Sequence, residues 1–168
     1  MAVRTILFYP DPKLRTKAQR VNKIDDEIRT LVKDMLETMY EFHGMGLAAT
    51  QIDVHKRVIV MDLSPDKSQQ IVLINPEILE KTGEQELSEG CLSLPGGSGM
   101  VKRAKHVMVK AQDLSGKEFT INAPGDYLSA CLQHEIDHLN GILYIDYLSP
   151  LKRQLLARKV KKCLRTLL

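Results

Sequence analysis

Residues 133–141 read Gln133-His134-Glu135-Ile136-Asp137-His138-Leu139-Asn140-Gly141, and most of the expected architecture follows from them. His134 and His138 are four residues apart, so on an α-helix they share one face and can bind one metal ion. Steps of about 100° per residue place Glu135 at the centre of an apolar stripe. That stripe consists of Leu128, Leu132 and Leu139. Because a buried carboxylate is costly unless it is paired or used, the helix is predicted to carry a metal site and a candidate acid/base into the core.

A catalytic metal ion usually takes three protein ligands and keeps one position open, so a third ligand is needed. Downstream of His138 the sequence has no further histidine, and Asp146 is its one acidic residue. The third ligand is therefore expected upstream, where the candidates are His43, His55, His106 and Cys91. Cys91 is favoured by its position after Gly90, which permits close backbone approach. The alternative for Cys91 is that of a small buried hydrophobe, which is the commoner role of a free cysteine.

Helical periodicity and capping residues predict three helices. Apolar residues recur at helical spacing over residues 25–43, and acidic residues at the start suit the helix dipole. The metal-bearing helix is expected over residues 126–140, with Asp126 as N-cap and Gly141 as the stop. A final helix is expected over residues 149–168.

Short segments rich in β-branched residues lie between the first two helices, separated by turn signals. These segments are residues 57–63, 71–75, 78–87, 106–113 and 118–122. Because no helix separates them, antiparallel pairing is expected. The predicted fold class is α+β: antiparallel sheets packed around a central metal-bearing helix, with a long N-terminal helix and a C-terminal helix. One catalytic domain is expected over residues 1–168.

The composition is that of a globular protein. Of 168 residues, 43% are hydrophobic and 27% are charged, which excludes disordered and collagenous chains. No apolar run reaches the roughly 18 residues of a membrane span, and no signal peptide is expected. Three cysteines without CxxC spacing indicate a reducing compartment, so a cytoplasmic location is expected.

Three separate segments match the signatures of one family, in the expected order. Gly44-Met45-Gly46-Leu47-Ala48-Ala49-Thr50-Gln51 corresponds to G-x-G-L-A-A-x-Q, Glu89-Gly90-Cys91-Leu92-Ser93 to E-G-C-L-S, and residues 133–139 to Q-H-E-x-D-H-L. On these segments the sequence resembles peptide deformylases. The length and the helical C-terminal extension resemble the bacterial form. The resemblance implies removal of the formyl group from the N-terminal formyl-methionine of new polypeptides, with release of formate.

The resemblance also implies a role for each matching residue. Three residues would bind the metal ion: Cys91, His134 and His138. Glu135 would be the general acid/base. The Gln51 side chain and the Leu92 backbone N–H would stabilise the oxyanion that forms when hydroxide generated at the metal attacks the formyl carbon. Family members use Fe²⁺, so one such ion per chain is expected here, and Zn²⁺, Ni²⁺ or Co²⁺ can take its place.

Substrate contacts are expected around the first two signatures and on the metal-bearing helix. The segment Gly44, Met45, Gly46 and Leu47 would present an uncluttered backbone edge to which a peptide adds as a strand. The other expected contacts are Glu89, Gly90, Leu128 and Cys131. Leu128, Cys131 and Leu92 would line an apolar pocket for the methionine side chain. Arg103 is expected to pair with Glu89 and so orient the loop of Cys91.

The last 18 residues carry seven positive charges and no acidic residue, whereas the rest has 17 basic against 21 acidic residues. Relatives with this extension are thought to dock near the ribosomal exit tunnel, so contact with ribosomal RNA is predicted. A solvated charged face is the plainer alternative. The other expected partners are nascent formyl-methionyl polypeptides, with no DNA and no membrane, and the chain is expected to be a monomer.

Two other functions stay open from the sequence. One is a ribosome-associated, non-enzymatic protein whose metal site is structural, which would require four protein ligands. The other is a general peptidase, which would cleave unformylated peptides as well.

Overall fold

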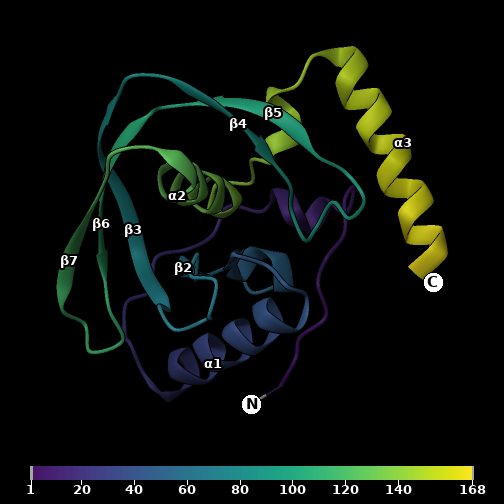
Figure 1. Ribbon diagram of the computed structural model, residues 1–168. Coiled ribbons are helices and arrows are strands. Elements are labelled where there is room, and N and C mark those ends of the chain that lie inside the picture. Colours follow the sequence, from purple (N-terminus) through teal and green to yellow (C-terminus); the bar gives the residue numbers. More distant parts are fainter. Residues whose placement is uncertain (1, 168) are drawn as a thin grey trace.

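Two antiparallel sheets and three α-helices make up residues 2–167, the part of the chain that the computed structural model describes (Figure 1). The larger sheet has the strand order β1 (Gly46–Ala48), β2 (Val58–Met61), β3 (Ile71–Thr82), β6 (His106–Gln112) and β7 (Glu118–Ala123). The smaller sheet pairs β4 (Gln85–Glu89) with β5 (Gly99–Arg103). Every pairing is antiparallel, so the predicted α+β class is confirmed. Residues 1 and 168, included in the expected domain, lie outside the described range.

The three α-helices are α1 (Asp26–Glu41), α2 (Asp126–Leu139) and α3 (Pro150–Leu167). Short 3-10 turns lie at Pro12–Arg15 (η1), Ala49–Ile52 (η2) and Tyr144–Tyr147 (η3). Figure 1 shows α2 passing between the larger sheet and the β4–β5 pair, with α1 below β2 and α3 at the periphery. Nine of the 14 residues of α2 are buried, as a helix enclosed on several sides requires. The expected central position of this helix is therefore confirmed.

The start of α1 follows its sequence signals, and its end does not. The Asp25 side chain caps the helix by accepting a hydrogen bond from the Ile28 N–H at 3.1 Å. The helix ends at Glu41, two residues before the predicted end. His43 adopts the left-handed conformation, with φ 57°, and the following Gly44 N–H bonds back to the Met39 carbonyl at 2.9 Å.

The prediction that Asp126 caps α2 is wrong. Gly125 occupies the cap position, no side chain caps the helix there, and Asp126 itself has φ 58°. Gln85 of β4 holds this end instead: it accepts from the Asp126 N–H at 2.9 Å and donates to its carbonyl at 3.0 Å. At the other end the predicted stop is confirmed, because Gly141 has φ 76°.

The predicted strands at 71–75 and 78–87 are divided differently in the structure. β3 continues through Asn75-Pro76 to Thr82, with a register shift against β6 at that point, and β4 begins only at Gln85. Asn75 adopts φ 52° and exchanges two hydrogen bonds of 2.8 Å with the Val21 backbone. A distant segment therefore satisfies the polar groups where the sequence suggested a break. The short strands β1 and β5 were not among the predicted segments.

Three clusters of buried side chains fill the interior. The first lies between α1 and the β1–β2 end of the larger sheet and includes Met35, Met39 and Val60. The second lies between that sheet and α2 and includes Leu73, Val109 and Leu132. The third joins the segment after Cys91 to η3 and α3, with members Leu94, Tyr144, Leu156 and Val160. Within the described residues, no helix is both long and apolar enough to cross a bilayer.

Candidate metal centre and active site

Cys91, His134 and His138 meet beneath the β4–β5 sheet. Cys91 follows β4, and the two histidines lie one turn apart on α2. The His138 Nε2 atom is 3.3 Å from the Cys91 Sγ and 3.2 Å from the His134 Nε2. All three donor atoms lie within 4.8 Å of one another, close enough to hold one ion. One thiolate and two imidazoles suit a divalent transition metal such as zinc or iron.

The structure separates Cys91 from the other candidates for the third ligand. His55 bonds to Asp53 at 2.9 Å on the surface, and the exposed face of the larger sheet holds His106 beside Asn122. His43 lies at the end of α1, on the wall of the cavity described below. Cys91 alone of the four belongs to the donor cluster found in residues 2–167.

A chain of buried charges fixes the orientation of His134. The His134 Nδ1 donates to the Glu89 carboxylate at 2.8 Å, which leaves Nε2 free for a metal ion. Arg103 donates two hydrogen bonds, of 2.6 and 2.8 Å, to the same carboxylate and a third, of 2.7 Å, to the Asp137 carboxylate. Burial raises the pKa of Glu89, but hydrogen bonds from Arg103 and His134 lower it by more, so the carboxylate stays ionised. The predicted pairing of Arg103 with Glu89 is confirmed.

The ligand histidines differ in their surroundings. Burial, followed by the neighbouring His134, lowers the pKa of His138, which keeps its imidazole neutral and able to donate a lone pair. Its Nδ1 is buried without a hydrogen-bond partner in the described residues. The Tyr144 ring stacks on His134 with a centroid separation of 6.0 Å, which limits the movement of that imidazole.

Glu135 points inward beside this cluster, as the helical stripe predicted. Its side chain is buried, Oε1 lies 4.0 Å from the His134 Nε2, and Oε2 has no partner in the described residues. Burial raises its pKa to about 7. A Cβ built on Gly46 would lie 2.8 Å from the Glu135 Oε1 and 3.0 Å from the Cys131 Sγ, so a larger residue at this position would displace these side chains. The carboxyl group is therefore poised to exchange a proton near neutral pH.

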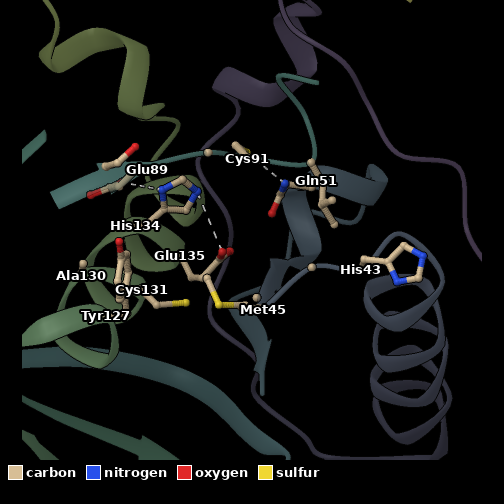
Figure 2. Close-up of a pocket in the computed structure, with 15 residues that line it drawn as sticks. His43, Met45, Gln51, Glu89, Cys91, Tyr127, Ala130, Cys131, His134 and Glu135 are labelled. Carbon is tan, nitrogen blue, oxygen red and sulfur yellow. Dashed lines mark hydrogen bonds and ion pairs between the residues drawn. The ribbon is translucent and has the colours of Figure 1, made fainter. Parts of the chain in front are cut away.

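Gln51, on η2, faces the cluster from the opposite side (Figure 2). Its Oε1 accepts from the Ala48 N–H at 3.0 Å, which fixes the orientation of the amide. Its Nε2 donates to the Ser93 Oγ at 3.0 Å and lies 3.5 Å from the Cys91 Sγ. The donor end of the amide is thus held near the metal-binding atoms.

A cavity of about 300 Å³ opens over these groups. Its wall includes these expected site residues: Gly44, Met45, Gly46, Gln51, Glu89, Gly90, Cys91, Leu92, Cys131, His134 and Glu135. His138 lies below them, 1% exposed. In Figure 2 the Met45 side chain extends between Cys131 and Glu135. Residues from all three of these separate segments therefore line one cavity.

Two expected substrate contacts lie outside the cavity wall. Leu47 is fully buried in the first cluster, so only its backbone is presented along β1. Leu128 packs against the second cluster, because its position on α2 faces the larger sheet. Glu89 does line the wall, but its carboxylate oxygens are already engaged by Arg103 and His134.

Four residues of the wall were not among the predicted contacts: His43, Ser88, Tyr127 and Ala130. Tyr127 and Ala130 share a helix face with Cys131 and His134, so the helical spacing alone contained the signal. Ser88 precedes Glu89 on β4, and alternation along that strand gave no reason to turn it toward the cavity. His43 was among the candidate third ligands, and no sequence signal marked it as a residue of the cavity wall.

The α+β fold, with a Cys-His-His donor set and a buried carboxyl group over an open cavity, defines a metal-dependent hydrolase. A family model described as polypeptide deformylase matches residues 3–154. The chain belongs to this family of enzymes. A curated peptide deformylase from Hamiltonella defensa subsp. Acyrthosiphon pisum (strain 5AT) is 50% identical over 162 residues, which cover 96% of this chain and 94% of the relative.

Solved structures give the same result. A peptide deformylase from Legionella pneumophila has a TM-score of 0.95 and 50% identity, over 98% of this chain and 97% of that one. A peptide deformylase from Ehrlichia chaffeensis, solved in complex with actinonin, has a TM-score of 0.91 and 41% identity, over 96% and 98%.

Proposed function

We propose that this chain removes the formyl group from the N-terminal formyl-methionine of new polypeptides and releases formate. The observation that carries the proposal is the Glu135 Oε2, which has no partner in the described residues and is buried beside the Cys-His-His cluster at the base of an open cavity. A buried carboxyl group without a partner is costly, so its position argues for use in chemistry. We propose that residues 1–168 form one catalytic domain.

Cys91, His134 and His138 would hold one divalent ion. Their donor atoms cluster as such an ion requires, and Glu89 already orients one imidazole for it. When bound, the ion polarises the formyl carbonyl and lowers the pKa of a water molecule. Sulfur and nitrogen donors do not by themselves select one divalent transition metal over another. We propose Fe²⁺ from the resemblance to the family, with Zn²⁺, Ni²⁺ or Co²⁺ able to replace it.

Glu135 would move the proton. In its ionised form it takes a proton from the attacking water, and in its protonated form it gives that proton to the leaving amine. A pKa of about 7 suits both roles, because neither form is strongly favoured at neutral pH. One carboxyl group thus serves both halves of the reaction and returns to its starting state.

Gln51 and Leu92 would stabilise the negative charge that develops on the formyl oxygen. The Gln51 amide is fixed through the Ala48 N–H, so its Nε2 donor needs little reorganisation. Leu92 follows Cys91 directly and lines the same cavity, and its backbone N–H would be the second donor. The loss of one such donor typically lowers the rate by about 10²–10³.

The substrate peptide would bind along β1. This strand lies at the edge of the larger sheet and pairs with β2 on one side. Gly44 to Leu47 therefore offer backbone groups to an added strand. The methionine side chain would enter the cavity beside Cys131, Leu92 and Tyr127.

The C-terminal helix would dock on ribosomal RNA. Its basic residues are all exposed: Lys152, Arg153, Arg158, Lys159, Lys161, Lys162 and Arg165. We propose that the protein acts in the cytoplasm, on nascent chains and as a monomer. Replacing Lys159, Lys161 and Lys162 by glutamate should weaken co-sedimentation with ribosomes most strongly at low salt. Unchanged co-sedimentation would argue for a merely solvated face.

The two alternative functions make different predictions. A structural metal site is closed by four protein ligands, whereas three donor side chains meet in residues 2–167. A general peptidase would hydrolyse unformylated peptides, which the proposed enzyme leaves intact.

The test compares wild type with Glu135→Ala and Glu135→Gln, all purified without oxygen. Formate release from a formyl-methionyl peptide is measured together with metal content. Both variants should retain the metal and lose at least about 10²–10⁴ in turnover, the contribution typical of a general acid/base. Normal turnover by either variant would remove Glu135 from the mechanism, and equal cleavage of an unformylated peptide by wild type would favour the peptidase.

A further inference from the structure

Leu156 faces inward from α3, and its side chain presses on the loop between β4 and β5. It is 3% exposed, whereas the neighbouring Leu155 is 47% exposed. A Cβ built on Gly97 would overlap the Leu156 Cδ1 and lie 3.3 Å from its Cγ. Figure 1 shows α3 running beside this loop. Helix and loop therefore lie close together here, and a side chain at position 97 would require Leu156 to move.

The same loop supports Cys91. A Cβ built on Gly90 would lie 3.6 Å from the Gly97 carbonyl oxygen. Gly97, which Leu156 contacts, therefore lies next to Gly90, the residue before Cys91. The Cys91 carbonyl also accepts a hydrogen bond from the Leu94 N–H at 2.9 Å. Gly97 therefore lies between Leu156 and the backbone that precedes Cys91.

The third core cluster contains Leu156 and also contacts Cys91. Leu94, Tyr144 and Leu156 belong to it, and Cys91 packs against it. Tyr144 in turn stacks on His134. Side chains around Leu156 therefore contact two of the three residues that form the donor cluster.

The loop has little stiffness of its own. Three of its four residues from 96 to 99 are glycine, and glycine loses more conformational freedom on ordering than any other residue. A second contact holds it in place, since a Cβ on Gly96 would lie 2.8 Å from the Cys163 Cβ of α3. The helix supplies the packing that the loop sequence lacks.

We infer that Leu156 is a positioning residue for Cys91: by packing on Gly97, it holds the loop in the conformation that presents the sulfur to the metal ion. The inference rests on the proposed function in one respect, namely that Cys91 binds the metal. It assigns α3 a role in the metal centre in addition to its basic outer face.

The experiment follows cobalt in the full-length protein. Wild type, Leu156→Ala and the matched control Leu155→Ala are loaded with Co²⁺ without oxygen. The thiolate-to-cobalt absorption band is recorded first. Excess chelator is then added, and the decay of this band gives the rate of cobalt loss. Leu156→Ala should lose cobalt about 10–100 times faster, the effect typical of residues that orient a ligand. Leu155→Ala should match wild type, and Leu156→Met should restore slow release because methionine has a similar volume.

Equal release rates for Leu156→Ala and wild type, with unchanged far-ultraviolet circular dichroism, would overturn the inference and leave the proposed function intact. If Leu156→Ala does not fold, the smaller truncation Leu156→Val decides by the same rates: faster release supports the inference, and equal release overturns it. A wild-type protein that binds cobalt without the thiolate band would overturn the role of Cys91, and with it both the inference and the proposed function.

Discussion

Replacing Arg103 by methionine removes the charge shared by the buried Glu89 carboxylate and the partly buried Asp137 carboxylate, while keeping a side chain of similar length. The Arg103 side chain is 4% exposed, and those of Glu89 and Asp137 are 6% and 17% exposed. Its three hydrogen bonds measure 2.6, 2.7 and 2.8 Å. Without Arg103, Glu89 keeps its bond to His134 and Asp137 its bond from the Tyr147 hydroxyl, but both lose the guanidinium charge. Breaking a buried ion pair in this way costs about 3–5 kcal/mol, so the free energy of unfolding should fall by that amount.

Lys102→Met is the matched control. Lys102 is the preceding residue on β5, its side chain is 71% exposed, and its Nζ lies 3.9 Å from Glu84. An exposed pair of this kind contributes at most about 1 kcal/mol. Urea unfolding of the metal-free proteins at pH 7, followed by circular dichroism, measures both differences.

The metal centre should respond as well. Glu89 keeps its bond to His134 but loses the partner that holds it in place, so metal affinity should fall about 10–100-fold in Arg103→Met. Competition with a chelator gives this affinity. If Arg103→Met proved as stable as Lys102→Met and bound metal as tightly as wild type, the buried charge chain would have no role in orienting His134.

Three further predictions concern single positions. Gly46→Ala would place a Cβ 2.8 Å from the Glu135 Oε1, so kcat/KM for a formyl-methionyl peptide should fall at least about 10-fold while the melting temperature changes little. Tyr144→Phe removes a buried hydroxyl without a partner in the described residues, and should raise the free energy of unfolding by about 1 kcal/mol; a clear loss would show that the hydroxyl is bonded. Burial raises the pKa of Asp34, but hydrogen bonds that include Arg4 lower it by more. Asp34→Asn should therefore be less stable than wild type at pH 7, and the gap in urea unfolding should close as the pH falls through that lowered pKa.

Local signals made the helices predictable. The Asp25 cap, the Gly141 stop and the apolar spacing act within one or two turns, so the sequence alone contains them. The strands depended more on distant contacts. Asn75-Pro76 has the composition of a turn, yet β3 continues through it because the Val21 backbone pairs with the Asn75 side chain. The N-terminus of α2 was misjudged for the same reason, since Gln85 holds it from another sheet.

In the site too, features set by local sequence were predictable and features set by distant contacts were not. The helical spacing of His134 and His138, and the inward direction of Glu135, followed from periodicity. The choice of Cys91 among four upstream candidates required the family signatures. The bond of Arg103 to Asp137 could not be predicted, because it depends on how β5 and α2 meet in space.

The most direct test of the metal centre is a titration of metal-free protein. Wild type is stripped with a chelator without oxygen, Fe²⁺ is added in small increments, and formate release from a formyl-methionyl peptide is followed. Activity should be absent at the start, rise linearly and reach its plateau at one ion per chain, with no rise in Cys91→Ala. Full activity in the stripped protein, or the same titration curve in Cys91→Ala, would contradict the assignment of Cys91, His134 and His138 as the catalytic metal site.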